Sequence, residues 1–125
     1  MFDTVLLPID QSRQAAETAA MALQLARQHG SRLVLLSVVE PGQDDPAAVA
    51  RLLEDARERF QAEGIACELL EREGKPAFVI GDVADEINAD VIVMGTRGLT
   101  LEADEAPSTA SRVIQLAPCP VMVVP

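Results

Sequence analysis

The chain alternates strictly between short apolar segments and longer segments with helical periodicity. The apolar segments, which predict strands, cover residues 4–9, 33–39, 65–72, 90–94 and 121–124. The predicted helices cover residues 12–29, 46–63, 76–87 and 108–116. Mostly apolar strands that alternate with helices favour parallel pairing through right-handed crossovers. The 125 residues therefore predict one domain, over 1–125, that folds as a three-layer α/β sandwich around a five-stranded parallel sheet.

The predicted helices carry recognisable local signals. Ala15, Ala19, Ala22 and Ala26 recur at spacings of three and four, which places small side chains on the face that packs on the sheet. Asp45 followed by Pro46 is typical of a helix start, because the carboxylate caps free N–H groups and proline at the first position has none to leave unpaired. The segment 65–72 alternates loosely, which predicts a more exposed strand.

The overall composition excludes several classes of partner. Twenty acidic residues against ten basic ones give a formal charge of -10, which repels nucleic acids and anionic membranes. Aromatic residues make up 2%, too few for a base-stacking surface. No apolar run approaches the length of about 18 residues that a membrane span needs, and the basic start of a signal peptide is absent. We therefore expect a cytoplasmic protein without nucleic acid or membrane partners.

The two cysteines predict neither a disulfide nor a metal site. Cys67 and Cys119 each stand alone in apolar surroundings, without the spacing of a zinc motif. We expect reduced thiols packed in the core. The single histidine, His29, precedes Gly30 and is expected at the end of the first helix, not in a catalytic role.

Unusual residues follow two of the predicted strands. Pro8, Ile9 and Asp10 follow the first strand, and the run Met94-Gly95-Thr96-Arg97-Gly98 follows the fourth. Open parallel sheets bind ligands beyond the carboxyl ends of their strands, where the strand order reverses. Glycines let a ligand approach the backbone, and a helix that starts near Ser108 presents free N–H groups to a phosphate. The plainer alternatives are two turn glycines, with Asp10 as a helix cap and Arg97 as a solvated turn residue.

Several motifs in the right order resemble the universal stress protein family. The stretch 89–98, Ala-Asp-Val-Ile-Val-Met-Gly-Thr-Arg-Gly, is similar to the family's fourth strand and first loop glycines. Pro8-x-Asp10-x-Ser12 matches the first strand and turn, and residues 36–39 and 117–124 match the second and last strands. The resemblance covers the whole chain. It implies a Rossmann-like sheet of the adenine nucleotide alpha hydrolase-like type, with strand order 3-2-1-4-5.

The resemblance also implies a nucleotide site. Asp10 and the backbone of Val38 would read the adenosine, Pro8 would lie beside them, and Met94 would form the floor of the cleft. The loop glycines would be Gly95 and Gly98, and Ser108 and Thr109 would bind phosphate. Arg97, which lies between the two glycines, is a further candidate for a contact with phosphate. The implied ligand is ATP or AMP, with Mg²⁺ only alongside ATP. No catalytic residue and no metal site of the protein itself are implied.

The sequence departs from the family pattern in the phosphate loop. Ser108 stands where a glycine is expected, and the loop before it carries Glu102, Asp104 and Glu105. A carboxylate about 6 Å from a phosphate charge costs roughly 1 to 3 kcal/mol, depending on the local dielectric. Three functions therefore stay open: an adenine-nucleotide-responsive regulator in stress adaptation, a relative that has lost the nucleotide and works through protein contacts, and a weak hydrolase with Mg²⁺ held by the acidic loop.

Dedicated catalytic machinery is not visible in the sequence. There is no Gly-x-Ser-x-Gly nucleophile motif and no lysine after a phosphate-binding Gly-rich loop. Any ATP hydrolysis is therefore expected to be slow. The last strand, 121–124, ends the chain as an apolar run without charges, and such a strand at a sheet edge tends to be covered. We expect homodimer formation through this strand, as the resemblance also implies. The sequence does not indicate which other protein, if any, is a partner.

Overall fold

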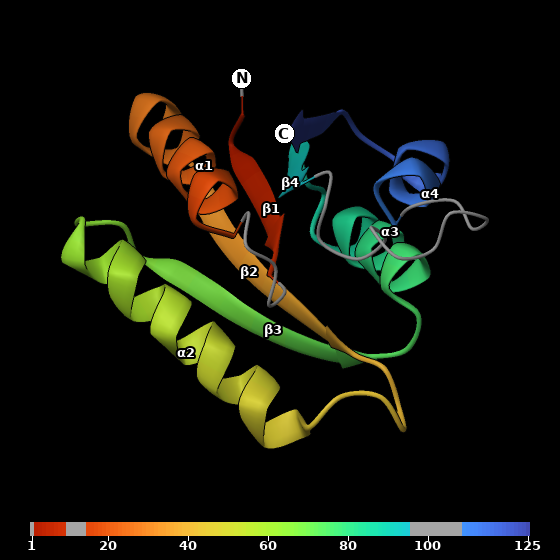
Figure 1. Cartoon of the computed structure of the whole chain (residues 1–125). Coiled ribbons are helices and arrows are strands. Elements are labelled where there is room, and N and C mark those ends of the chain that lie inside the picture. Colours follow the sequence, from red (N-terminus) through yellow and green to blue (C-terminus); the bar gives the residue numbers. More distant parts are fainter. Residues whose placement is uncertain (1, 10–14, 96–108) are drawn as a thin grey trace.

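A computed structural model describes residues 2–9, 15–95 and 109–125 of the chain (Figure 1). The strands are β1 (Thr4–Pro8), β2 (Arg32–Val39), β3 (Cys67–Glu73), β4 (Val91–Gly95) and β5 (Val121–Val124). The helices are α1 (Ala15–His29), α2 (Pro46–Ala62), α3 (Pro76–Glu86) and α4 (Thr109–Leu116). This element order is the predicted one.

The described strands form one parallel sheet in the order β3-β2-β1-β4-β5, as predicted. β1 lies in the centre, where Val5 pairs with Leu33 of β2 on one side and with Val91 of β4 on the other. The chain builds the sheet outward from β1 to β3 and then returns to the other side of β1. This reversal places the carboxyl ends of β1 and β4 next to each other at the switch point of the sheet.

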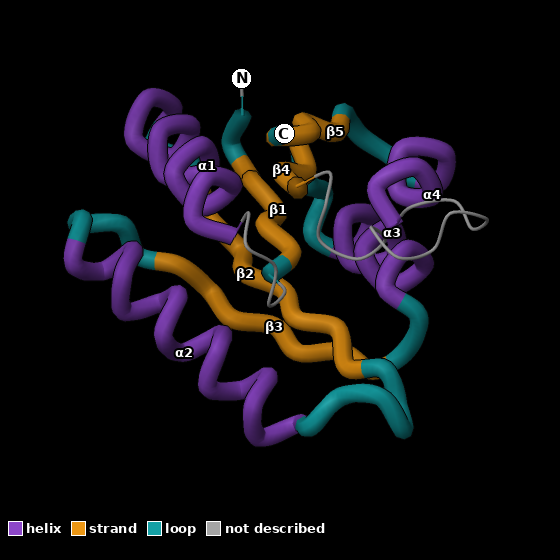
Figure 2. Tube along the Cα trace, in the orientation of Figure 1, coloured by secondary structure: helices purple, strands orange, loops and turns teal. Residues whose placement is uncertain are grey.

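Helices cover both faces of the sheet, which gives the predicted three layers (Figure 2). Alternate strand residues point to opposite faces, so Leu6, Val34 and Leu36 pack with α3 and α4. Leu7 and Leu35, one residue out of phase, pack with α1 and α2. None of the helices that the structure describes has the length and apolar character that a membrane span requires.

The ends of the elements follow from local hydrogen bonds. The Asp45 carboxylate accepts from the Ala47 N–H at 3.1 Å and Pro46 starts α2, which confirms the predicted helix start. β3 begins at Cys67, two residues later than predicted, because the Ile65 N–H donates to the Phe60 carbonyl and so completes the end of α2. β3 is the half-exposed strand that its loose alternation predicted.

Two glycines around α3 are expected to respond in opposite ways to alanine. Gly74 has a φ of +143°, and an added Cβ would lie 2.9 Å from Val79 Cγ2. The change Gly74→Ala is therefore expected to lower the free energy of unfolding by about 1 to 3 kcal/mol. Gly81, inside α3, leaves ordinary contact distances of 3.7 Å and 4.0 Å to Leu116, so Gly81→Ala should raise stability by about 0.5 to 1 kcal/mol. Urea denaturation of both variants measures the change in the free energy of unfolding. A change of the same sign in both variants would contradict the prediction.

Candidate functional site

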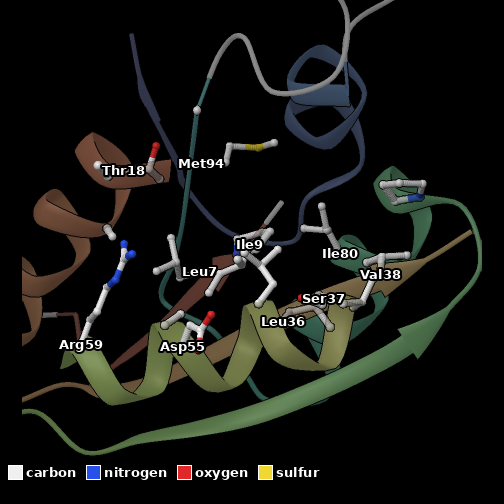
Figure 3. Close-up of a pocket in the computed structure, with 18 of the residues that line it drawn as sticks. Leu7, Ile9, Thr18, Leu36, Ser37, Val38, Asp55, Arg59, Ile80 and Met94 are labelled. Carbon is white, nitrogen blue, oxygen red and sulfur yellow. The ribbon is translucent and has the colours of Figure 1, made fainter. Parts of the chain in front are cut away.

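A cavity of about 840 Å³ opens at the carboxyl end of the sheet (Figure 3). Five of the residues that the sequence analysis proposed for a nucleotide site line it: Pro8, Val38, Met94, Gly95 and Thr109. They come from the ends of β1, β2 and β4 and from the first residue of α4. The other four, Asp10, Arg97, Gly98 and Ser108, lie outside the described residues, as do Glu102, Asp104 and Glu105.

Backbone pairing holds the strand ends around this cavity. The Ile9 N–H donates to the Leu36 carbonyl at 2.7 Å, which extends the pairing of β1 with β2 beyond the last residue of β1. Gly95 pairs with Val124 at the end of β5. The site residues on β1, β2 and β4 therefore come together because three neighbouring parallel strands end at the same edge.

The cavity continues into a groove between α1 and α2, which the sequence analysis did not foresee. Its lining there includes Ala19 and Leu23 of α1, and Leu52 and Ala56 of α2. α1 packs over β1, β4 and β5, whereas α2 packs over β2 and β3, so the two helices diverge across the sheet (Figure 1). The spacing of the α1 alanines predicts a surface for close packing on the sheet. Of these alanines, Ala19 lines the groove, whereas Ala22 and Ala26 are buried in the core.

One polar side chain lies in the floor of this groove without a partner. Ser37 of β2 is 1% exposed and lines the cavity, yet its Oγ has no hydrogen-bond partner among the described residues. It lies in an apolar strand, between Leu36 and Val38 (Figure 3). A buried hydroxyl that lacks a partner is destabilising, and native structures generally satisfy such groups with protein, water or a ligand.

The charged residues that line the cavity are mostly acidic. Glu40, Asp44, Asp55 and Glu63 contribute carboxylates, and Arg59 contributes a guanidinium group. The Asp44 carboxylate accepts from the Glu40 N–H at 2.8 Å, so it serves the turn after β2. Glu63 pairs with Arg27 at 2.6 Å. Figure 3 shows the side chains of Asp55 and Arg59 on α2 beside the cavity.

The cysteines do not provide an activated thiol. Cys67 and Cys119 are both free and half-buried, so they are less deeply packed than predicted. Burial is the main cause that raises the pKa of each thiol, which favours the protonated form at neutral pH. Within the described residues, no group of three or more His, Cys, Asp or Glu side chains is placed to hold a metal ion. His29 is the last residue of α1, as predicted. Its ring packs edge-on against the ring of Phe2, with 5.4 Å between the two ring centroids.

Comparison with known proteins identifies the family. The model of the universal stress protein family matches residues 1–125, the whole chain. The chain belongs to the universal stress protein family. Universal stress protein Sll1654 of Synechocystis sp. is 53% identical over 100% of this chain and 87% of its own length. The alignment spans 136 positions against 125 residues here, so that relative has residues without a counterpart in this chain.

Solved structures of universal stress proteins share the fold. One in complex with cAMP has a TM-score of 0.83 at 25% identity, with 98% of this chain and 96% of that chain covered. The protein from Archaeoglobus fulgidus in complex with dAMP has a TM-score of 0.79 at 26% identity, with 99% and 98% covered. The Rossmann-like fold inferred from the sequence is therefore confirmed.

Proposed function

We propose that this universal stress protein is a cytoplasmic regulator that binds an adenine nucleotide at the carboxyl end of its sheet. The observation that carries the proposal is the gathering of Pro8, Val38, Met94, Gly95 and Thr109 around one cavity. The sequence motifs by themselves point to each of these residues. A volume of about 840 Å³ also lies within the range of roughly 300 to 1,000 Å³ that is typical of small-molecule sites.

The structural relatives support an adenine nucleotide as the ligand. Two of them were solved with cAMP and with dAMP, and both ligands carry one phosphate group. A single phosphate also meets less repulsion from nearby carboxylates than a triphosphate does. We therefore propose AMP as the preferred ligand and ATP with Mg²⁺ as the weaker one. We assign no catalytic residue, and at most slow ATP hydrolysis is expected.

Isothermal titration tests this proposal. We expect micromolar binding of AMP and weaker binding of ATP with Mg²⁺. The Ser108→Gly variant should strengthen ATP binding more than AMP binding, because a glycine restores the family pattern at the phosphate loop. Guanosine monophosphate serves as the control ligand. Absence of binding by both proteins, with the fold verified by circular dichroism, would reject the nucleotide proposal and favour a module that acts through protein contacts.

A second proposal concerns assembly through β5. This strand lies at the edge of the sheet, and its apolar side chains Val121, Met122 and Val123 are only half-buried. An apolar edge strand without charged residues tends to pair with another strand. We propose that two copies of the chain pair through β5 and so form a homodimer.

The substitution Val123→Lys tests the dimer. A lysine on an edge strand opposes strand pairing, so we expect the variant to sediment as a monomer where the wild type sediments as a dimer. Ile114→Lys is the matched control, because Ile114 is an apolar residue of α4 that is 56% exposed and lies outside β5. Dissociation by Ile114→Lys and not by Val123→Lys would move the interface to α4.

A further inference from the structure

The groove between α1 and α2 is a second part of the cavity, distinct from the five strand-end residues discussed above. We call it the interhelix groove. Leu7 and Ser37 form its floor, Ala19 and Leu23 its α1 wall, and Leu52 and Ala56 its α2 wall. Apart from Ser37, these side chains are apolar. Thr18 of α1 adds a second buried hydroxyl to the lining, and Asp55 and Arg59 of α2 add exposed charged side chains. The groove therefore has the character of a small-molecule site, with mostly apolar walls and a few polar groups.

An ion pair ties the two helices together at one end of the groove. Arg27 in the last turn of α1 donates to the Glu63 carboxylate at 2.6 Å and to the Glu63 carbonyl at 3.0 Å, just beyond α2. From this end the helices diverge toward the carboxyl ends of the strands (Figure 1). The interhelix groove is thus narrowed where α1 and α2 end and is continuous with the open cavity where they begin.

Ser37 provides independent evidence for a ligand in the interhelix groove. The residue lines the cavity, and its Oγ is buried and has no hydrogen-bond partner among the residues that the structure describes. Neither neighbour of Ser37 across the sheet accounts for a hydroxyl at this position. Ile9, which follows β1, has an apolar side chain. Glu71 of β3 is the register partner of Ser37 through the backbone. A hydroxyl in this position can both donate to and accept from a group that enters the interhelix groove.

We propose that the interhelix groove binds a neutral, mostly apolar small molecule, about the size of two fused rings, which carries one hydroxyl or carbonyl group that pairs with Ser37 Oγ. The apolar walls favour a ring system, because its transfer out of water is the main driving force. The carboxylates of Glu40, Asp44, Asp55 and Glu63 around the cavity outnumber the guanidinium group of Arg59 and disfavour an anion. Burial beside Ser37 disfavours any charged group, because a charge loses its hydration there. The proposal does not depend on nucleotide binding, since it rests on other residues of the same cavity.

The fluorescent compound 2-naphthol is a suitable probe, with 2-methylnaphthalene as the control that replaces the hydroxyl by a methyl group. The chain has no Trp and no Tyr, so the emission of either probe can be followed without a protein background. We expect both probes to bind the wild type. The change Ser37→Ala should weaken 2-naphthol about fivefold to tenfold, the usual effect of one lost hydrogen bond, and leave 2-methylnaphthalene within about twofold.

A pair of matched variants locates the site. Ala56→Leu fills the interhelix groove and should weaken both probes more than about tenfold, whereas Ala50→Leu, on the exposed side of the same helix, should leave both unchanged. Circular dichroism confirms that each variant folds. The melting temperature of Ser37→Ala should not fall, because the hydroxyl has no partner in the free protein. The proposal is overturned if neither probe binds the folded wild type, if Ser37→Ala affects both probes equally, or if that variant loses stability without a change in binding.

Discussion

The change Leu35→Ala is expected to lower the free energy of unfolding by about 3 to 5 kcal/mol. Leu35 lies on β2, inside the sheet, and is 0% exposed between the sheet and the helices α1 and α2. Removal of its side chain leaves a cavity that strands paired on both sides cannot close. Because domains of this size are stable by only about 5 to 15 kcal/mol, the loss is a large fraction of the total. Chemical denaturation with urea measures it directly.

Leu69→Ala is the matched control for this prediction. Leu69 of β3 is the register partner of Leu35 and packs against the same core cluster, but it lies on an edge strand and is only half-buried. Leu69→Ala should therefore lower the free energy of unfolding by about half as much as Leu35→Ala does. Equal losses at both positions would mean that β3 is as tightly packed as β2, which the burial of the two side chains contradicts.

The change Thr109→Glu is expected to weaken AMP binding about tenfold or more and to leave the fold intact. Thr109 is the first residue of α4 and lines the cavity, on the side where the proposed phosphate meets the helix start. A carboxylate there repels a phosphate by roughly 1 to 3 kcal/mol. A negative charge at a helix N-terminus is itself stabilising, so the melting temperature should stay the same or rise.

Two comparisons isolate the charge in this experiment. Thr109→Gln has nearly the same size as Thr109→Glu without the charge, and it should bind AMP within about threefold of the wild type. Adenosine, which has no phosphate, should bind the wild type and Thr109→Glu equally. If adenosine lost as much affinity as AMP, Thr109 would contact the nucleoside, and the phosphate would have to lie elsewhere in the cavity.

Both predictions follow from the same architectural feature. β1 and β2 carry core residues on both faces, so their interior positions are devoted to packing. Their ends at Pro8 and Val38, together with Gly95 of β4, are where the helices no longer cover the sheet and a ligand has room. Stability and binding therefore depend on different residues of the same strands, and substitutions can change one without the other.

The local sequence determined the order and type of the elements. Apolar runs such as 33–39, helix starts such as Asp45-Pro46 and the stop at Gly30 each have a short-range physical cause, so they could be predicted without knowledge of the fold. The strict alternation then left the parallel three-layer sandwich as the consistent arrangement. The motif residues at Pro8 and 94–95 indicated which strand ends to examine, because ligands bind at the switch point of such sheets.

The tertiary structure alone decided the shape of the cavity. The helical pattern showed which faces of α1 and α2 are apolar, but the gap between the helices depends on which strands each one covers and on their angle across a twisted sheet. Ser37 illustrates the limit: in the sequence it is one polar residue in an apolar strand, and only the packing around it shows a buried hydroxyl without a partner. Periodicity fixes the direction of a side chain relative to its own element, whereas the space in front of it is set by residues far away in the chain.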